Sequence, residues 1–121
     1  MTDARRGDVV LIAFPFIAHG QTEQKRRPAV IIQADRYNRR RSAAIIAAIT
    51  TAMKQTLPCK IPVAHRSPEG RRAGLRLDSV IDCQTLATVP SEEVVRKLGT
   101  LTPELMLRVD DALRDALGIS S

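Results

Sequence analysis

The sequence predicts a single domain, residues 1–121, that is mainly β with appended helices, an α+β protein. Short apolar segments rich in Val, Ile and Leu follow one another at short intervals up to residue 90, which is typical of antiparallel strands. One amphipathic segment closes the chain and predicts a helix that packs on those strands. The chain has no glycine-rich phosphate loop and no strand–helix alternation, so a nucleotide-binding α/β sheet is not expected.

Apolar, β-branched runs bounded by polar or turn-forming residues predict the strands. They cover residues 7–16, 28–35, 43–51, 59–65 and 77–90, the last as one or two strands. Pro28 opens its segment, where a missing N–H donor is tolerated, and Pro62 predicts that its strand lies at a sheet edge. The alanines of 43–51 leave a helix open as an alternative.

The remaining segments predict loops and helices. Residues 17–27 and 66–74 are polar and predict loops, and 36–42 is a basic connector with room for one helical turn. A Ser, two acidic residues and a closing Gly predict a short helix over 91–99. Residues 102–118 predict the longest helix, with Thr102 as cap, Pro103 in the first turn and Gly118 as stop. Its apolar stripe consists of Leu105, Val109, Ala112, Leu113 and Ala116.

The charge is basic and unevenly distributed. Residues 1–60 carry 11 Lys and Arg but 4 Asp and Glu, whereas residues 61–121 carry 8 and 9. A basic first half suits a polyanionic partner, either nucleic acid or an acidic protein segment, although a merely basic surface would look the same. Phe14, Phe16 and Tyr37 are the only aromatic residues, so a broad base-stacking platform is not expected.

The cysteines and the compartment signals suggest a cytoplasmic protein. The opening residues MTDARRGD lack the apolar stretch of a secretion signal, and no apolar run approaches the roughly 20 residues that span a membrane. Cys59 and Cys83 form no CxxC pair and have no His at metal-ligand spacing. They are therefore predicted to be separate buried thiols, and no metal site is expected.

Five sequence blocks occur in a specific order along the chain. They are RRGDVVLIAF, then RRPAVIIQADRYN with a Gly seven residues before its Arg-Pro step, then AAIT, LDSVIDCQ and LGTLTPELMLRVDDALRDALGI. Single blocks are weak signals, but this ordered set resembles the MazF/PemK family of toxin endoribonucleases from type II toxin–antitoxin systems. The resemblance covers residues 6–119.

The resemblance implies a small SH3-like β-barrel with the C-terminal helix packed on the sheet, acting as a homodimer. It implies sequence-specific cleavage of single-stranded RNA (mRNA) through attack of the 2′-OH, with no metal or other cofactor. It also implies inhibition by a cognate antitoxin whose acidic, disordered tail lies along the RNA-binding groove.

The resemblance assigns the catalytic pair to Arg27 and Thr50. In the family these are an Arg directly before the Pro of the second strand and a Thr at the end of the third. The chemistry fits, because the guanidinium of Arg27 can hold two phosphate oxygens at once. The Thr50 hydroxyl can donate to the same phosphate or orient the 2′-OH, and the base that accepts the 2′-OH proton is left open.

The other candidate site residues are expected to contact RNA. They are His19, Gln21, Lys25, Arg26, Gln84 and Phe16. For each of them a plainer role is open: a solvated surface cation, a partner inside the barrel or, for Phe16, a core side chain. His65 is predicted to be structural or exposed, and Asp78 is predicted to be a hydrogen-bonding turn residue.

Two other functions are compatible with the same fold. One is a non-catalytic toxin that binds DNA gyrase, and the other is an RNA-binding module that has lost activity. The pairing of Arg27 with Thr50 and the basic first half favour the ribonuclease.

Overall fold

The computed structural model describes residues 4–18, 21–39, 42–51 and 57–120, and for 14–18 and 21–25 it describes the backbone alone. The strands are β1 (Asp8–Ala18), β2 (Gln21–Ile31), β3 (Ala43–Thr51), β4 (Lys60–Val63), β5 (Ser79–Pro90) and β6 (Val94–Thr100). The helices are α1 (Asp35–Asn38), α2 (Pro68–Arg72), the 3₁₀ turn η1 (Ser91–Glu93) and α3 (Pro103–Leu117).

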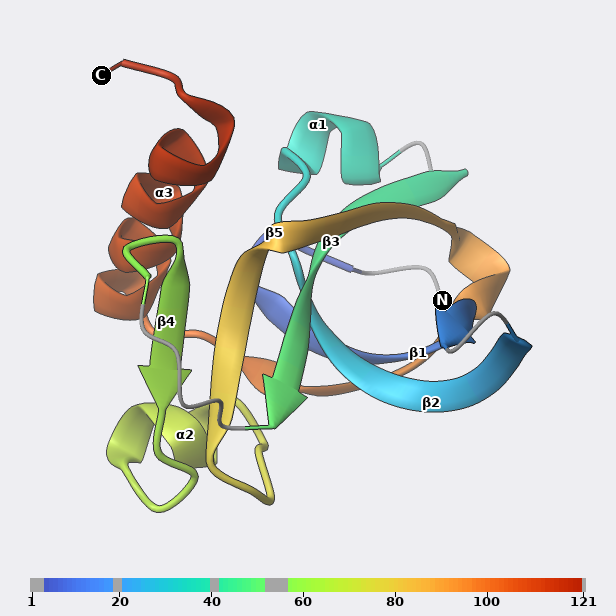
Figure 1. The fold of residues 1–121 in the computed structure, drawn as a ribbon, viewed down its shortest axis with the longest axis horizontal. Helices are drawn as coiled ribbons and strands as arrows, with labels where there is room; N and C mark the ends of the chain where they lie inside the picture. The colour runs from blue at the N-terminus through green and yellow to red at the C-terminus, as the bar shows by residue number, and fades with distance from the viewer. Residues whose placement is uncertain (1–3, 19–20, 40–41, 52–56, 121) are drawn as a thin grey trace.

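The six strands form one sheet in the order β4-β5-β3-β2-β1-β6, and every pairing in it is antiparallel. The sheet curls strongly, and β1 and β2 sweep around one side of the molecule (Figure 1). The α3 helix stands beside β4 and β5, while α2 and α1 lie at opposite ends of the sheet (Figure 1). The prediction of a mainly antiparallel sheet with appended helices is confirmed.

Two apolar clusters lie on the two faces of the curled sheet. Val9 and Val30 belong to the cluster covered by α3, whereas Val10 and Ile31 belong to a second cluster inside the curl. Successive residues of a strand point to opposite faces, so β1 and β2 are buried on both sides. This burial explains the near-continuous apolar runs that predicted these strands.

The predicted loop at 17–27 is wrong. β1 runs to Ala18 and β2 begins at Gln21, and the two strands pair along their whole length, up to Ala18↔Gln21. Backbone hydrogen bonds to a neighbouring strand hold polar residues as well as apolar ones, so the polar composition of this segment did not prevent pairing. Pro28 therefore lies inside β2 and not at its first residue, at the point where the ladder with β3 ends.

The predicted helix over 91–99 is also wrong. Only η1 is helical, and from Val94 the chain forms β6, which pairs with β1. The Ser and the two acidic residues do start a helical turn, but Val94 and Val95 favour a strand, and the free edge of β1 supplies its partner.

The segment predicted as a loop at 66–74 contains the short helix α2. Ser67 caps it by accepting a hydrogen bond from the Gly70 N–H at 3.0 Å, and Pro68 occupies the first turn. The sequence does contain the signals for this helix, a Ser cap followed by a Pro, but the density of Pro, Gly and Arg favoured the prediction of a loop.

The other elements agree with the predictions. β3 spans 43–51, β4 forms one edge of the sheet, α1 is the single turn in the basic connector, and 79–90 forms one strand. The α3 helix has Thr102 as its cap and ends at Gly118, whose φ is 69°. Its stripe packs on the core, with Leu105, Val109 and Ala112 buried.

Both cysteines are free and buried, as predicted. The Cys83 N–H donates to the Cys59 carbonyl at 3.0 Å, so they are neighbours across β4 and β5. Burial, together with the nearby Cys59 and Asp82, raises the pKa of the Cys83 thiol to about 11. Within the described part of the chain, no helix is long and apolar enough to cross a membrane.

Candidate active site

The candidate site lies where β2 and β3 separate. The two strands pair over three described positions, and Ala29↔Ala48 is the pair nearest the opening. Beyond it β3 remains paired with β5 as far as Thr51↔Ser79, whereas β2 remains paired with β1. The two strands follow different partners from this point, and the sheet opens between them.

Arg27 and Thr50 occupy matching positions on the two diverging strands. Each lies two residues beyond the Ala29↔Ala48 pair, so an extension of the register would place them opposite one another. Because side chains alternate along a strand, Arg27 shares a face with Ala29, and Thr50 shares that face with Ala48. Two residues that are 23 positions apart in the chain are thus brought to one place by strand pairing.

A cavity of about 540 Å³ occupies this opening, and both Arg27 and Thr50 line it. Its polar lining includes four arginines and three hydroxyl residues, and its apolar wall is built mainly from leucines. The arginines are Arg26, Arg27, Arg76 and Arg96, and the hydroxyl residues are Thr50, Thr51 and Ser79. None of the described residues that line the cavity is acidic.

The Thr50 hydroxyl is unusual. Its Oγ1 atom is buried and has no hydrogen-bond partner among the described residues. Leaving a buried hydroxyl unsatisfied costs roughly 1–3 kcal/mol, and such exceptions in a native protein call for an explanation. By contrast, Ser79 in the same cavity is satisfied, since its Oγ donates to the Leu77 carbonyl at 2.7 Å. The Thr50 hydroxyl is therefore a buried donor that none of the described residues uses.

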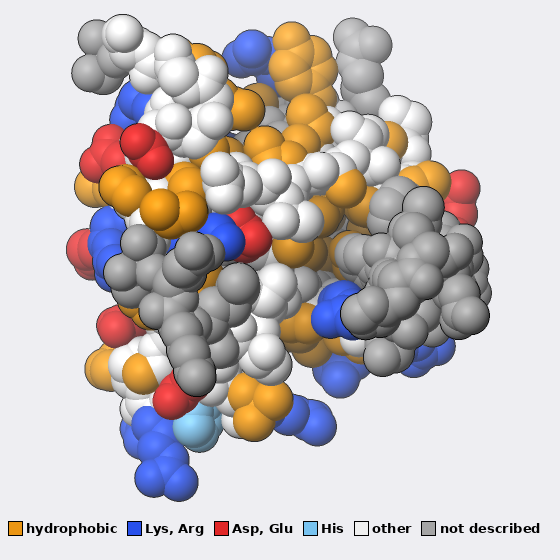
Figure 2. Space-filling model, viewed as in Figure 1, with side chains coloured by type: hydrophobic (Ala, Val, Ile, Leu, Met, Phe, Trp, Pro, Cys, Tyr) orange, Lys and Arg blue, Asp and Glu red, His pale blue; other side chains and the backbone are white. Residues whose placement is uncertain are grey.

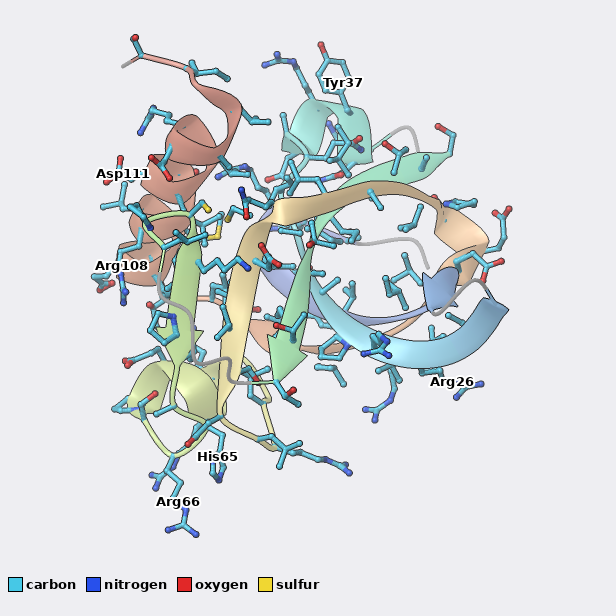
Figure 3. All side chains as sticks on the ribbon, in the orientation of Figure 1. Arg26, Tyr37, His65, Arg66, Arg108 and Asp111 are labelled. Carbon is cyan, nitrogen blue, oxygen red and sulfur yellow. The ribbon has the colours of Figure 1, made fainter. Side chains whose placement is uncertain are left out.

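The carboxylate of Asp78, which is next to cavity residues in the sequence, is hydrogen-bonded to His65. Asp78 lies between Leu77 and Ser79, which line the cavity, but it accepts hydrogen bonds from the backbone N–H and the Nδ1 of His65 at 3.0 and 2.7 Å. The hydrogen bonds from the His65 ring and then from its backbone hold the pKa of Asp78 below its ordinary value. His65 and Asp78 are thus joined as a pair, and Figure 3 shows His65 at the end of the molecule where α2 lies.

The cavity offers cationic and hydroxyl groups, with no group that titrates near neutral pH among its described lining residues. Such a site suits the binding and stabilisation of a phosphate anion, because guanidinium groups stay charged and donate in a fixed fork. No cluster of three or more His, Cys, Asp or Glu that could hold a metal ion occurs within the described residues.

The other residues predicted to contact RNA differ in where they lie relative to the cavity, and some are not described. Arg26 lines the cavity beside Arg27 and reaches outward from β2 (Figure 3). Gln84 is exposed on β5 and does not line the cavity; its N–H donates to Asp82 Oδ1 at 3.0 Å. His19 and the side chains of Phe16, Gln21 and Lys25 lie outside the described part of the chain. For all six residues, contact with RNA stays a prediction.

Two cavity residues were not singled out by the sequence. Arg76 lies in the loop before β5, and Arg96 lies on β6, in the segment that was predicted to be a helix. Arg76 has no basic neighbour in the sequence and Arg96 is followed by Lys97 alone, so only the fold shows that they share a cavity with Arg27. The charges are unevenly distributed on the surface shown in Figure 2. Basic and acidic side chains alternate along α3, whereas basic side chains predominate below β2.

Comparison with known proteins identifies the family. Residues 5–117 match the model of the PemK-like, MazF-like toxins of type II toxin–antitoxin systems. The chain belongs to this family. It is 32% identical over 115 residues to endoribonuclease EndoA of Bacillus subtilis (strain 168), covering 95% of each chain. It is 35% identical over 117 residues to endoribonuclease MazF of Staphylococcus epidermidis, covering 97% of this chain and 93% of the relative.

Solved structures show the same fold. An endoribonuclease from a mycobacterial species superposes with a TM-score of 0.76 at 21% identity, covering 100% of this chain and 97% of that one. A mycobacterial endoribonuclease in complex with its cognate antitoxin gives a TM-score of 0.75 at 22% identity, covering 98% and 99%. The curled six-stranded sheet with its C-terminal helix is thus the fold of the MazF-like toxins.

Proposed function

We propose that this MazF-like toxin cleaves single-stranded RNA by attack of a 2′-OH on the adjacent phosphate, with Arg27 and Thr50 acting on that phosphate. Endoribonuclease activity is what the relatives EndoA and MazF described above are named for. The observation that carries the site assignment is the buried Thr50 Oγ1, which has no partner among the described residues, in the wall of a cavity that Arg27 also lines.

The reaction makes defined demands on these groups. The 2′-oxygen forms a bond to phosphorus and loses its proton, while the bond from phosphorus to the 5′-oxygen breaks and that oxygen gains a proton. The products are a 2′,3′-cyclic phosphate and a 5′-OH. Negative charge grows on the phosphate oxygens in the transition state, and Arg27 is suited to stabilise it with its two-pronged guanidinium. The Thr50 hydroxyl is suited to donate to the same oxygens, which would satisfy an atom that has no partner within the described part of the chain.

The direct test uses purified protein and a mixed-sequence single-stranded RNA in excess EDTA, with mapping of the ends. Cutting at a short recurrent sequence, with a 2′,3′-cyclic phosphate and a 5′-OH, is the expected result. A single 2′-deoxy nucleotide 5′ to the cleaved bond should abolish cutting there, because the nucleophile is missing. Cutting that persists with the 2′-deoxy nucleotide, or that requires a divalent metal, would rule out this mechanism.

The two alternative functions make different predictions. A toxin that binds DNA gyrase would inhibit supercoiling and leave RNA intact, and an inactive module would bind RNA without cutting it. Neither is favoured, since both curated relatives are named endoribonucleases. The arginine-rich cavity has a clear role in a ribonuclease and none that gyrase binding requires.

Partners follow from the same proposal. We expect the toxin to act as a homodimer in the cytoplasm and to be silenced by an acidic antitoxin, which the net charge of +6 favours. One solved structure of this fold is described as a complex of an endoribonuclease with its cognate antitoxin. Light scattering on the purified chain tests the dimer, and addition of the cognate antitoxin should block RNA cleavage at equimolar ratio.

A further inference from the structure

The arginines of the cavity exceed what one scissile phosphate needs. Arg26, Arg27, Arg76 and Arg96 line a single cavity to which the described residues contribute no carboxylate. Like charges gathered in a concave site repel one another and raise the local positive potential. The arrangement is therefore built for an anion with more than one charge, and two of its arginines lie away from the Arg27–Thr50 pair in the fold.

Strand register places Arg96 on the far side of β1 from the catalytic pair. Leu11 on β1 pairs with Arg96 on one side and with Pro28 on the other. Directly paired residues of antiparallel strands project to the same face, so Arg96, Leu11 and Pro28 share a face, and it is opposite to the one that Arg27 shares with Ala29. Their backbones are two strand spacings apart, or about 10 Å. Arg96 thus reaches the cavity from the strand beyond the one that neighbours Arg27.

Close backbone packing places the Arg76 loop beside β6. A Cβ added to Gly74 would lie 2.2 Å from the Leu98 carbonyl oxygen, and one added to Gly99 would lie 2.2 Å from the Arg72 carbonyl oxygen. Gly74 also has a φ of 75°, which favours glycine. These two contacts between backbones bring the loop that follows α2 onto β6, next to Arg96.

We propose that Arg76 and Arg96 form a second phosphate subsite, which binds the RNA phosphate next to the one that is cleaved. This inference rests on the proposed function, because it takes the cavity to be the path of the RNA strand. Each guanidinium can donate two parallel hydrogen bonds to phosphate oxygens and carries one positive charge, so the pair more than balances the single negative charge of a backbone phosphate. The adjoining apolar wall of Leu75, Leu77 and Leu98 gives the intervening nucleotide a surface to lie on.

The first test measures binding and not cleavage. The probe is a 2′-O-methyl version of the cleaved oligonucleotide, which lacks the nucleophile, and its affinity is followed by fluorescence anisotropy over a range of salt concentrations. Arg76→Gln and Arg96→Gln should each weaken binding about 10- to 100-fold, because each removes charge-assisted hydrogen bonds to the phosphate. The slope of log K against log salt should fall by about 0.7 for each phosphate that the variant no longer neutralises.

The matched control is Arg66→Gln, which removes the same charge from an exposed arginine that does not line the cavity and points away from the molecule (Figure 3). It should leave affinity and salt slope close to those of the wild type. In cleavage assays Arg76→Gln and Arg96→Gln should raise KM far more than they lower kcat, since binding at a neighbouring phosphate stabilises substrate and transition state alike.

The second test locates the phosphate. Probes carrying one neutral methylphosphonate linkage at a time should bind the wild type weakly when the linkage adjacent to the cleavage position is neutralised. The double variant Arg76→Gln/Arg96→Gln should show no further loss with that probe, while it still loses affinity when other linkages are neutralised. Such non-additivity identifies a direct contact between the pair and that phosphate.

Three results would overturn the proposal. The first is a loss of affinity in Arg66→Gln equal to that in the cavity variants, which would mean that only total charge matters. The second is a double variant that responds to every neutralised linkage as the wild type does. The third is RNA binding that is unchanged in the variants while binding of a poly-glutamate peptide is lost, which would make the pair a protein-docking site. If instead Arg27 and Thr50 variants keep cutting RNA, the proposed catalytic pair fails, and these binding data still decide the subsite.

Discussion

Arg27 on β2 and Thr50 on β3 both line one cavity, two residues beyond the Ala29↔Ala48 pair at which their strands part. The opening of the sheet lets both residues line the cavity, Arg27 with an exposed side chain and Thr50 with a buried hydroxyl, without interrupting the pairing of either strand with its other neighbour. The scaffold of the site is therefore rigid, because each residue sits on a strand anchored elsewhere in the sheet.

Arg27→Lys keeps the charge but loses the planar fork. If Arg27 holds two phosphate oxygens in the transition state, kcat should fall by roughly 100- to 1,000-fold, the loss seen when one oxyanion donor is removed. The change lies on an exposed side chain, so the thermal unfolding midpoint should move little. Single-turnover cleavage of a short RNA measures the first quantity and circular dichroism the second. A variant with the wild-type rate would remove Arg27 from the mechanism.

Thr50→Val separates activity from stability. Val has nearly the shape of Thr and favours strands, but it lacks the buried hydroxyl for which the described residues supply no partner. Cleavage should be lost, whereas the free energy of unfolding should be unchanged or up to about 1 kcal/mol higher, since an unsatisfied polar group is removed. Urea denaturation and RNA cleavage measure the two effects, with Thr50→Ser as the control that should retain activity. A clear fall in stability would mean that the hydroxyl has a structural partner.

Gly74→Ala should damage the loop that carries Arg76. The left-handed backbone costs a non-glycine residue about 1–2 kcal/mol, and the new Cβ would in addition collide with the Leu98 carbonyl. We expect a total loss above about 2 kcal/mol in urea denaturation. Gly118→Ala is the matched control, because its φ is also positive and a Cβ there meets nothing within 4 Å. Equal losses in the two variants would show that the contact with β6 is unimportant.

Asp35 makes stability depend on pH in the acidic range. Its carboxylate accepts hydrogen bonds from the Arg6 N–H at 2.7 Å and from the Asn38 amide at 3.0 Å. These bonds, that from the Arg6 backbone first, hold the pKa of Asp35 below its ordinary value of 3.8. A depressed pKa in the folded state stabilises the fold above pH 3.8 and loses that effect as pH falls through the folded-state pKa.

The corresponding measurement is the thermal unfolding midpoint between about pH 6 and pH 2. Wild type should lose stability below about pH 4, and Asp35→Asn should show a shallower loss over the same window. Curves of equal slope for the two proteins would show that other carboxylates account for the acid sensitivity.

Cys59 and Cys83 should resist thiol reagents in the folded protein. Both are buried, and the raised pKa of Cys83, about 11, leaves almost no thiolate at about pH 8. A colorimetric thiol assay should therefore detect little reaction in native buffer and reaction of both thiols in denaturant. Rapid reaction of the native protein would show that the edge formed by β4 opens readily.

The sequence predicted the elements whose local signals were complete. The α3 helix carries its cap, its first-turn proline, its apolar stripe and its stop within residues 102–118, so no other part of the chain is needed to define it. For β3 the strand was the favoured prediction, although the alanines of 43–51 left a helix open, and the structure shows the strand. The catalytic pair came from the family resemblance and not from composition, because a lone arginine beside a proline is usually a solvated residue.

The predictions were wrong for two segments whose secondary structure depends on pairing with another strand. Residues 21–27 are polar and gave no strand signal, yet they pair with β1 residue by residue. Val94–Thr100 follows residues that are typical of a helix start, yet it pairs with the free edge of β1 and forms β6. In both cases the hydrogen-bonding partner lies far away in the chain, and a local pattern cannot contain it.

The sequence by itself determined the family, the mainly antiparallel fold, the C-terminal helix and the basic character of the protein. The tertiary structure alone decided that Arg76 and Arg96 join Arg27 in one cavity and that the Thr50 hydroxyl has no partner among the described residues. The physical reason is that two relations decide which side chains meet. One is the strand register, and the other is the close backbone contact of Gly74 and Gly99 between the loop after α2 and β6. These are relations between distant segments, and they exist only once the sheet has formed.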